Sequence, residues 1–283
     1  MAAATRRAGV IGWPIGHSLS PLIHETWAAR EGIKAAYARI EVEPGYENFA
    51  RAVMRLAEQG YRGVNITLPH KENALRFAVE RGGDASETAL AAGAANMLTF
   101  DGAPFADNSD ASGFAAALGE ILDARAGRAV VLGAGGAARG IVLALTSLGV
   151  GEIVIANRTP ARAEEIAGRL GARAVEWTDR EGALADADIL VNATSLGMKG
   201  APPLEISIDA LPDRAIVFDI VYAPLETALL KAARARGLKT IDGLSMLMHQ
   251  AVPAYKTWLG ARAEVDADLR ARLEAALAER GAA

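Results

Sequence analysis

The sequence alternates between short apolar segments rich in β-branched residues and longer segments with helical apolar spacing. The pattern is clearest in the second half, where 128–135 and 152–158 read as strands and 137–149 and 160–172 as helices that end on glycine. Strand and helix in this order predict a parallel sheet with helices on both faces. The same half contains further expected strands at 187–195, 215–222 and 238–242 and an expected helix at 225–237.

The first half alternates as well and predicts a second α/β unit. Strands are expected at 8–12, 35–43 and 64–68, helices at 21–32 and 46–60, and a hairpin at 96–108. The two C-terminal segments 244–260 and 267–281 read as helices and do not continue the alternation. The fold class is therefore α/β, with an N-terminal α/β unit and a Rossmann-type, doubly wound parallel sheet.

Composition excludes several classes of function. The net charge of −4 is spread along the chain, so we expect no nucleic-acid partner. The chain has no cysteine, and its four histidines show no metal-ligand spacing, so no metal site is expected. Neither a signal peptide nor an apolar run of roughly 18 residues is present, which predicts a soluble, cytoplasmic protein without a membrane partner.

A glycine-rich loop, 132–140, lies where an expected strand passes into a helix. Gly133, Gly135 and Ala138 fit the pattern G-x-G-x-x-G/A, and Gly136 and Ala137 open the helix. The first glycine permits a tight turn, the second lets a pyrophosphate approach the backbone, and the third position allows close packing. In this context the loop predicts a dinucleotide-binding site, and the alternative is a purely structural turn.

The next expected strand ends without the acidic residue that is typical of NAD-binding proteins. Asn157, Arg158 and Thr159 stand there instead, followed by Arg162. A carboxylate would repel a 2′-phosphate, whereas a guanidinium can bind one with two hydrogen bonds. The sequence therefore favours NADP, and the alternative is that both arginines are solvated charges at the start of a helix.

Polar residues also gather around the expected strand ends of the first half. They are Ser18, Ser20, Asn65, Thr67, Lys71, Asn96 and Asp110. Taken singly, each is more often a turn or cap residue than a ligand. Ser20, for example, is a plausible N-cap before Pro21.

Taken together and in this order, these residues give the chain a resemblance to the shikimate dehydrogenase family over nearly its whole length. The matching stretches are PIGHSLSPLIH, VNITLPHK, GAAN, DNSD, LGAGGAARG, NRTPARA, NATSLGM, FDIVYAP and GLSMLMHQA. The resemblance implies a substrate-binding catalytic domain formed by 1–110 and 244–283. It also implies an NADP-binding Rossmann domain formed by 111–243, with the last helices returning to the substrate domain.

The resemblance also implies roles for individual residues. Lys71 and Asp110 match the family's catalytic pair. The positions that match substrate-binding residues are Ser18, Ser20, Asn65, Thr67, Asn96, Tyr222 and Gln250. The cofactor positions are Gly133, Gly135, Gly136, Ala137, Asn157, Arg158, Thr159, Arg162, Thr194 and Gly243.

The implied reaction is the NADP-dependent, reversible reduction of 3-dehydroshikimate to shikimate, a step of chorismate and aromatic amino-acid biosynthesis. The ketone oxygen of the substrate gains negative charge as the hydride arrives. The ammonium of Lys71 can supply this oxygen with a proton or a positive charge. The expected partner is a small-molecule substrate, and the expected state is a monomer or a homodimer.

The chain departs from the family pattern at four positions. Met97 stands where the family has threonine after GAxN, and Ser109 and Ala111 change DNTDG to DNSDA. Ser245 changes GLGML to GLSML. These changes leave open a related quinate/shikimate or amino-shikimate dehydrogenase. A cofactor-binding protein without turnover is less favoured, because a pure binder needs neither Lys71 nor Asp110.

Overall fold

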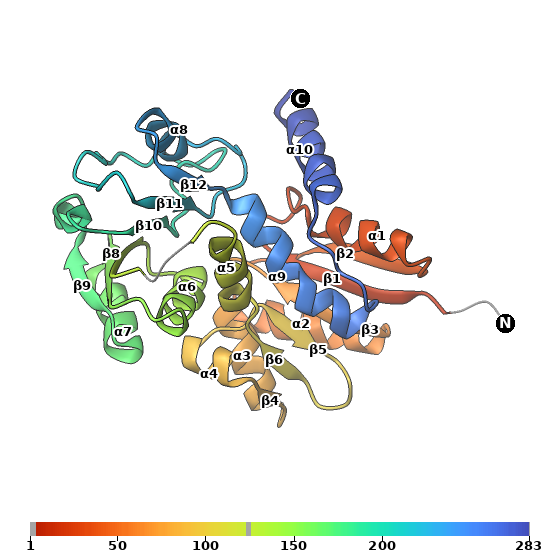
Figure 1. Cartoon of the computed structure of the whole chain (residues 1–283). Coiled ribbons are helices and arrows are strands. Elements are labelled where there is room, and N and C mark those ends of the chain that lie inside the picture. The colour runs from red at the N-terminus through yellow and green to blue at the C-terminus, as the bar shows by residue number, and fades with distance from the viewer. Residues whose placement is uncertain (1–3, 123–125, 283) are drawn as a thin grey trace. The chain divides into compact units, whose positions relative to one another are not determined.

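The computed structural model describes residues 4–122 and 126–282 (Figure 1). The chain divides into two compact units. Unit 1 contains the residues up to Asp110 together with Gln250–Leu273, and unit 2 contains Ala111–His249 and the residues from Glu274 onward. The returning segment of unit 1 is thus narrower than the expected 244–283. The assignment of the substrate to unit 1 and of the cofactor to unit 2 stays a prediction.

The sheet of unit 1 is mixed, with the strand order β2-β1-β3-β5-β6-β4. β1 pairs in parallel with β2 and β3, and the expected hairpin at 96–108 is confirmed by the antiparallel pairing of β5 and β6. The strands are β1 (Arg6–Gly12), β2 (Ala35–Glu41), β3 (Tyr61–Ile66), β4 (Asp84–Ala85), β5 (Met97–Thr99) and β6 (Phe105–Asp107).

Helices pack on both faces of this sheet. On one face, α2 and α3 bury Phe49 and Phe77 against Ile66 and Leu98 of the strands. On the other face, Trp258 packs directly against Gly63, where a Cβ would come within 2.3 Å of the indole ring. The Nε1 of Trp258 donates to Thr99 Oγ1 at 2.9 Å. The helices are α1 (Ser20–Arg30), α2 (Tyr46–Glu58), α3 (Lys71–Glu80), α4 (Glu87–Ala92) and, shared with unit 2, α9 (Gly243–Trp258) and α10 (Ala267–Ala282).

Unit 2 contains a parallel sheet with the strand order β12-β11-β10-β7-β8-β9. If the strands are renumbered 1 to 6 from β7 to β12, the order read from the β9 edge is 3-2-1-4-5-6. This is the strand order of dinucleotide-binding folds. The predicted Rossmann-type sheet is confirmed. The strands are β7 (Arg128–Leu132), β8 (Glu152–Asn157), β9 (Arg173–Glu176), β10 (Ile189–Asn192), β11 (Ile216–Asp219) and β12 (Lys239–Ile241).

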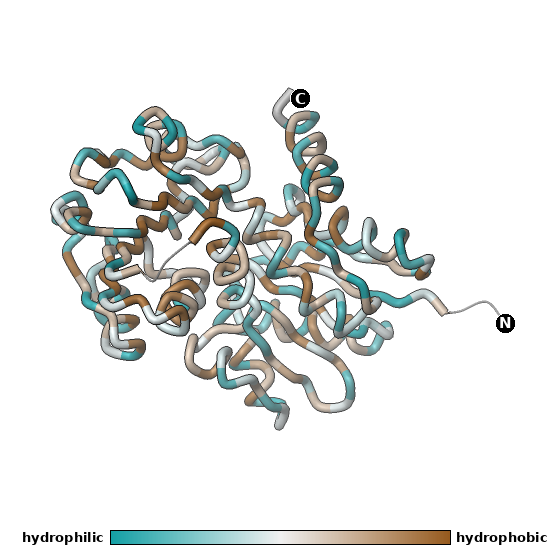
Figure 2. The backbone as a smooth tube through the Cα atoms, viewed as in Figure 1, coloured by the Kyte–Doolittle hydropathy of each residue, from teal (hydrophilic) through white to brown (hydrophobic). Residues whose placement is uncertain are grey.

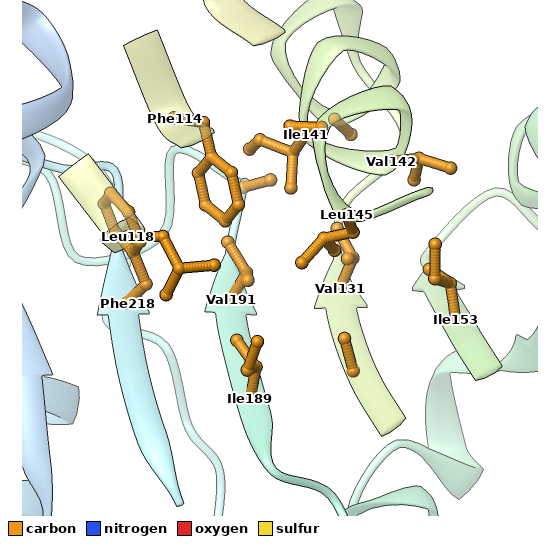
Figure 3. Close-up of a cluster of buried hydrophobic side chains, with 14 of the residues drawn as sticks. Phe114, Leu118, Val131, Ile141, Val142, Leu145, Ile153, Ile189, Val191 and Phe218 are labelled. Carbon is orange, nitrogen blue, oxygen red and sulfur yellow. The ribbon is translucent and has the colours of Figure 1, made fainter. Parts of the chain in front are cut away.

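Successive residues of these strands point to opposite faces, and both faces are apolar. Val131 and Val191 pack under Phe114, Ile141 and neighbouring side chains of α5 and α6 (Figure 3). The alternate residues pack into a second cluster on the other face. Brown, apolar stretches accordingly run along the strands of this sheet in Figure 2. The helices are α5 (Asp110–Gly119), α6 (Gly136–Ser147), α7 (Pro160–Leu170) and α8 (Ala228–Ala235), with short 3-10 helices at Trp177–Asp179 and Gly182–Leu184.

Several element boundaries differ from the sequence expectation. Helix α1 begins at Ser20 itself, and its N-cap residue is Leu19, with no side-chain cap bond, so the N-cap interpretation of Ser20 is wrong. Strand β3 ends at Ile66, which places Thr67 just beyond it. The expected helix at 225–237 begins only at Ala228, because the Thr227 hydroxyl accepts from Leu230 N at 3.3 Å and caps it.

Within residues 4–122 and 126–282, no helix has the length and apolarity that crossing a membrane requires.

Candidate functional site

Lys71 and Asp110 form a mostly buried ion pair in unit 1. Lys71 is the first residue of α3, and Asp110 is the first residue of α5. The Lys71 ammonium donates to Asp110 Oδ2, and the two side chains are 12% and 5% exposed. A pair this far from water is only weakly screened, so the charge on the lysine acts strongly on a nearby group.

The backbone around each member of the pair is anchored by a buried polar residue. Before Lys71, the His70 ring hydrogen-bonds the Val42 carbonyl at 2.8 Å and is completely buried. Before Asp110, Asn108 accepts from the Asp110 amide at 3.0 Å and donates to the Ala94 carbonyl at 2.9 Å. Both residues therefore hold a helix start in place rather than act on a ligand.

Asn96 connects the ion pair to the returning helix α9. Its Nδ2 lies 2.9 Å from Asp110 Oδ1, 3.0 Å from Ser109 Oγ and 3.3 Å from Gln250 Oε1. The Ser109 hydroxyl in turn donates to the Gln250 carbonyl at 2.8 Å. Three residues far apart in sequence, Asn96, Asp110 and Gln250, thus meet at one polar centre.

Asn65 lies beside this centre at the end of β3. Its Nδ2 donates to the Asn96 carbonyl at 3.2 Å, and its Oδ1 accepts from the Tyr37 hydroxyl at 2.6 Å. Thr67 follows two residues later, and its amide donates to the Ile11 carbonyl at 2.9 Å. A Cβ at Gly12 would come within 2.5 Å of the Thr67 methyl group, so glycine leaves room for this side chain.

Ser18 and Ser20 form a buried hydroxyl pair at the start of α1. Their Oγ atoms are 3.2 Å apart, and Ser18 Oγ accepts from the Ser20 amide at 3.3 Å. The loop is held from β2, where the Arg39 guanidinium donates twice to the Ser18 carbonyl, at 2.9 and 2.7 Å. Two hydroxyl groups and a neighbouring positive charge suit an anionic group such as a carboxylate.

The structure explains how most of the departures from the family pattern are accommodated. Ala111 lies in the first turn of α5 and is not among the residues with positive φ, so alanine there causes no backbone strain. Ser109 keeps the hydroxyl that binds the Gln250 carbonyl. Ser245 donates to Glu120 at 3.1 Å. Met97 is buried and pairs directly with Asn65 across the β3–β5 ladder, which places both side chains on one face.

The glycine loop of unit 2 has the form that a dinucleotide requires. Gly133 has φ +105°, and a Cβ there would lie 2.9 Å from the Ala193 carbonyl oxygen, so the turn itself needs glycine. Gly135 has φ −91°, and a Cβ there would meet no atom of the described residues within 4 Å. The fold therefore gives no reason for glycine at 135, whereas the approach of a pyrophosphate to the backbone does.

The N-terminus of α6 continues this cradle. The helix begins at Gly136 and Ala137, where the first amide groups have no intrahelical partner and attract phosphate. Ala138, the third small position of the motif, is fully buried. The residues present fit a bound dinucleotide.

A buried polar network supports the loop that faces Gly133. The Thr194 hydroxyl donates to Asn192 Oδ1 at 2.7 Å, and Asn192 Nδ2 donates to Asp219 Oδ1 at 2.9 Å. Asp219 is fully buried and also accepts from the Thr227 hydroxyl at 2.7 Å. Burial raises the pKa of Asp219 to about 6, although its hydrogen bonds act in the opposite direction. This carboxylate lies in the stretch FDIVYAP, but the sequence assigned it no role.

The residues expected at the adenosine ribose follow β8. Asn157 Nδ2 donates to the Thr159 carbonyl at 2.9 Å, and Thr159 is the N-cap of α7 without a side-chain cap bond. Arg158 and Arg162 are exposed, and no described residue pairs with either guanidinium. Both cations are therefore available to a phosphate group.

Tyr222 and Gly243 lie in unit 2 on neighbouring segments. Gly243 starts α9 and donates its amide to the Val221 carbonyl at 3.2 Å. A Cβ at Gly243 would lie 2.1 Å from the Ile220 carbonyl oxygen, so close packing explains this glycine. Tyr222 is half-buried on the segment after β11.

Among the described residues, no cluster of three or more histidine, aspartate or glutamate side chains has the geometry of a metal site.

Two family models match the chain. Residues 10–98 match the substrate-binding domain of shikimate dehydrogenase, and residues 116–199 match shikimate / quinate 5-dehydrogenase.

Full-length relatives agree with these matches. The chain is 49% identical to the NADP(+) shikimate dehydrogenase of Rhodopseudomonas palustris (strain TIE-1), with 98% of this chain and 99% of that protein covered. Shikimate 5-dehydrogenase from Thermus thermophilus, solved with NADP(H) and shikimate, superposes with a TM-score of 0.82 at 33% identity over 96% of this chain and 99% of that one. Quinate dehydrogenase from Corynebacterium glutamicum, solved with NAD, superposes with a TM-score of 0.85 at 30% identity over 96% and 99%. The chain belongs to the shikimate dehydrogenase family.

Proposed function

We propose that the protein catalyses the NADP-dependent, reversible reduction of 3-dehydroshikimate to shikimate. The observation that carries the proposal is the buried Lys71–Asp110 pair joined to Asn96, in a chain 49% identical to an NADP(+) shikimate dehydrogenase. A protein that only binds its ligands has no use for a buried lysine charge, because burying it is costly.

Lys71 is the proposed catalytic acid of the reduction. When bound, NADPH supplies the hydride. The ammonium of Lys71 stabilises the negative charge that develops on the substrate oxygen and can donate a proton to it. Asp110 holds this ammonium in place through Oδ2, while its Oδ1 accepts from Asn96 at 2.9 Å. In the oxidation of shikimate the same lysine accepts the proton.

The remaining polar residues of unit 1 are proposed to bind the substrate. Ser18 and Ser20 offer two hydroxyl groups to its carboxylate, and Asn65, Thr67, Asn96 and Gln250 offer amide and hydroxyl groups to its ring hydroxyls. Because Asn65, Asn96 and Gln250 are joined by hydrogen bonds within unit 1, their side chains are preorganised. Tyr222 is proposed to bind the substrate as well.

The cofactor is proposed to occupy the cradle of unit 2. Gly133, Gly135, Gly136 and Ala137 would take the pyrophosphate, and Thr194 and Gly243 would line the rest of the site. Arg158 and Arg162, with Asn157 and Thr159, would take the 2′-phosphate of the ribose. Both guanidinium groups are exposed and unpaired among the described residues, which suits a phosphate ligand.

A second candidate is oxidation of quinate. It rests on Met97, which replaces a family hydroxyl beside Asn65, and on the similarity to a quinate dehydrogenase. We also infer that the protein is a soluble, cytoplasmic enzyme that acts as a monomer or homodimer.

The test is the change in nicotinamide absorbance with NADP or NAD, offering shikimate or quinate. Rapid reduction of NADP with shikimate, at a kcat/KM well above that with quinate, supports the proposal. Preference for quinate would move the protein to the second candidate. Preference for NAD with shikimate would keep the substrate and reject NADP as the cofactor. No turnover with any of the four pairs would overturn the assignment.

A further inference from the structure

The amide of Asn65 has only one orientation that satisfies its surroundings. The Asn96 carbonyl, 3.2 Å away, can only accept a hydrogen bond, so Nδ2 of Asn65 must face it. Oδ1 therefore faces the Tyr37 hydroxyl at 2.6 Å, and the tyrosine must donate. With the amide turned over, Oδ1 would face the carbonyl oxygen, and the two acceptors would repel each other.

Tyr37 is held rigidly by its own neighbours. It is 4% exposed, and its ring stacks on His24 with centroids 4.1 Å apart and planes 6° from parallel. His24 is fully buried and packs edge-on against Trp27 at 5.9 Å. Tyr255 completes the cluster, 6.1 Å from His24. A hydroxyl on a ring fixed in this way has little freedom to point elsewhere.

The sheet register gives the reason why Tyr37 reaches Asn65. Tyr37 is aligned with Ala8 of β1 and, through it, with Gly63 of β3, two residues before Asn65. Positions two apart on a strand share a face. Since Ala8 and Gly63 carry little or no side chain, the tyrosine can extend across β1 toward Asn65.

Once these two bonds are made, Asn65 retains one amide hydrogen and one free lone pair on Oδ1. A hydroxyl group can use both, because it donates and accepts at once. An amide held by the Asn96 carbonyl alone would keep the hydrogen but would be fixed at only one end, and its buried oxygen would lack a partner.

We propose that Tyr37 is a positioning residue that orients the Asn65 amide toward a ring hydroxyl of the substrate and so sets substrate affinity and hydroxyl specificity. The proposal rests on the proposed function. It assigns to Tyr37 no contact with the reacting atoms.

The test compares Tyr37→Phe with wild type and with Tyr255→Phe as a matched control. Both changes remove one hydroxyl from the same aromatic cluster, but the Tyr255 hydroxyl donates to Glu31 at 2.7 Å and not to a proposed substrate ligand. The KM for shikimate should rise about five- to tenfold in Tyr37→Phe, since one hydrogen bond is worth on the order of 1 kcal/mol. The KM for NADP should be unchanged, and Tyr255→Phe should keep both values.

A double variant separates positioning from general loosening of the unit. In an Asn65→Ala background, Tyr37→Phe should have no further effect on the KM for shikimate, because the group that it orients is gone. Any of three results would overturn the role of Tyr37. They are an unchanged KM for shikimate in Tyr37→Phe, an equal rise of this KM in Tyr255→Phe, and the same rise when Tyr37→Phe is added to Asn65→Ala. A wild-type protein that neither oxidises nor binds shikimate, measured by calorimetry, would instead reject the proposed function and the inference with it.

Discussion

At the scale of the single residue, the ammonium of Lys71 is the group on which the proposed chemistry depends. Lys71→Ala should lower kcat on the order of 100-fold or more, because general acid–base groups contribute about that much. The KM for shikimate should change far less, since the proposed substrate-binding groups lie on other residues. Lys256→Ala, which removes an exposed lysine of α9, is the control and should leave both parameters unchanged. Steady-state kinetics with NADP measure both, and normal turnover in Lys71→Ala would contradict the assignment.

Arg158 is proposed to carry the preference for NADP. Removing it in Arg158→Ala should weaken NADP binding about tenfold to a hundredfold, the usual loss for a charge-assisted hydrogen bond, and leave NAD binding nearly unchanged. Arg169→Ala is a matched control, because Arg169 lies in the last turn of α7, whereas Arg158 precedes that helix. Dissociation constants from fluorescence titration with both cofactors decide the question. Equal losses for NADP and NAD would place the 2′-phosphate elsewhere.

Sequence motifs identified candidate site residues but not the residues that support them. Lys71, Asn96 and Asp110 were identified from their motifs, and the structure brings them together through hydrogen bonds. Tyr37 and Asp219 were missed, because each lies within an expected strand and its polar contact depends on which strands or loops come to lie beside it. The sequence of a single strand does not indicate whether a polar side chain on it faces a ligand, another residue or water.

At the scale of the element, the strand-to-helix turn before α6 contains two glycines with different reasons to be there. Gly133→Ala should lower thermal stability, because positive φ and the Ala193 carbonyl oxygen both oppose a Cβ. Gly135→Ala should keep the thermal midpoint but weaken NADP binding, since its Cβ would project into open space. Thermal denaturation and cofactor titration of the two variants separate these effects. Unchanged NADP affinity in Gly135→Ala would contradict the proposed pyrophosphate site.

The type of each element was easier to predict than its boundaries. The parallel sheet of unit 2 followed from the alternation, because strands such as β7 and β10 are buried on both faces and therefore apolar throughout. The start of α1 could not be predicted in the same way. A serine before a proline is typical of an N-cap. Ser20 is instead the first residue of the helix, and its hydroxyl contacts that of Ser18. The order of the mixed sheet in unit 1 depends on long-range pairing that local patterns do not contain.

At the scale of the whole molecule, the dependence of stability on pH includes two buried groups that act in opposite directions. Burial lowers the pKa of His24 from 6.5 to about 3, so between these values the unfolded chain binds a proton that the folded chain does not. Its contribution to stability is therefore lost as the pH falls below 6.5. Burial raises the pKa of Asp219 from 3.8 to about 6, so between these values the folded chain binds a proton that the unfolded chain does not. The contribution of Asp219 to stability is therefore lost as the pH rises from 3.8 to about 6.

His24→Phe isolates the first contribution. Neither ring nitrogen of His24 has a hydrogen-bonding partner among the described residues, so phenylalanine removes a titrating group without breaking a bond. The variant should gain stability relative to wild type by about 1.4 kcal/mol for each pH unit below 6.5. Urea unfolding at several pH values measures the difference. A constant difference between pH 6.5 and 4 would show that His24 is protonated in the folded protein.

Asp219→Asn should show the opposite trend, because asparagine resembles the protonated acid and does not titrate. Relative to wild type, the variant should gain stability as the pH rises from 4 to 6, by about 3 kcal/mol in total, and the gain should then level off. In wild type, His24 and Asp219 change the free energy of unfolding in opposite directions between pH 4 and 6. Each single variant should therefore reveal the pH dependence that the other group contributes. Urea unfolding of both single variants and of the double variant across pH 4–7 tests this, with the double variant losing both slopes. A slope of the same sign in the two single variants would contradict the assignment of these pKa shifts to His24 and Asp219.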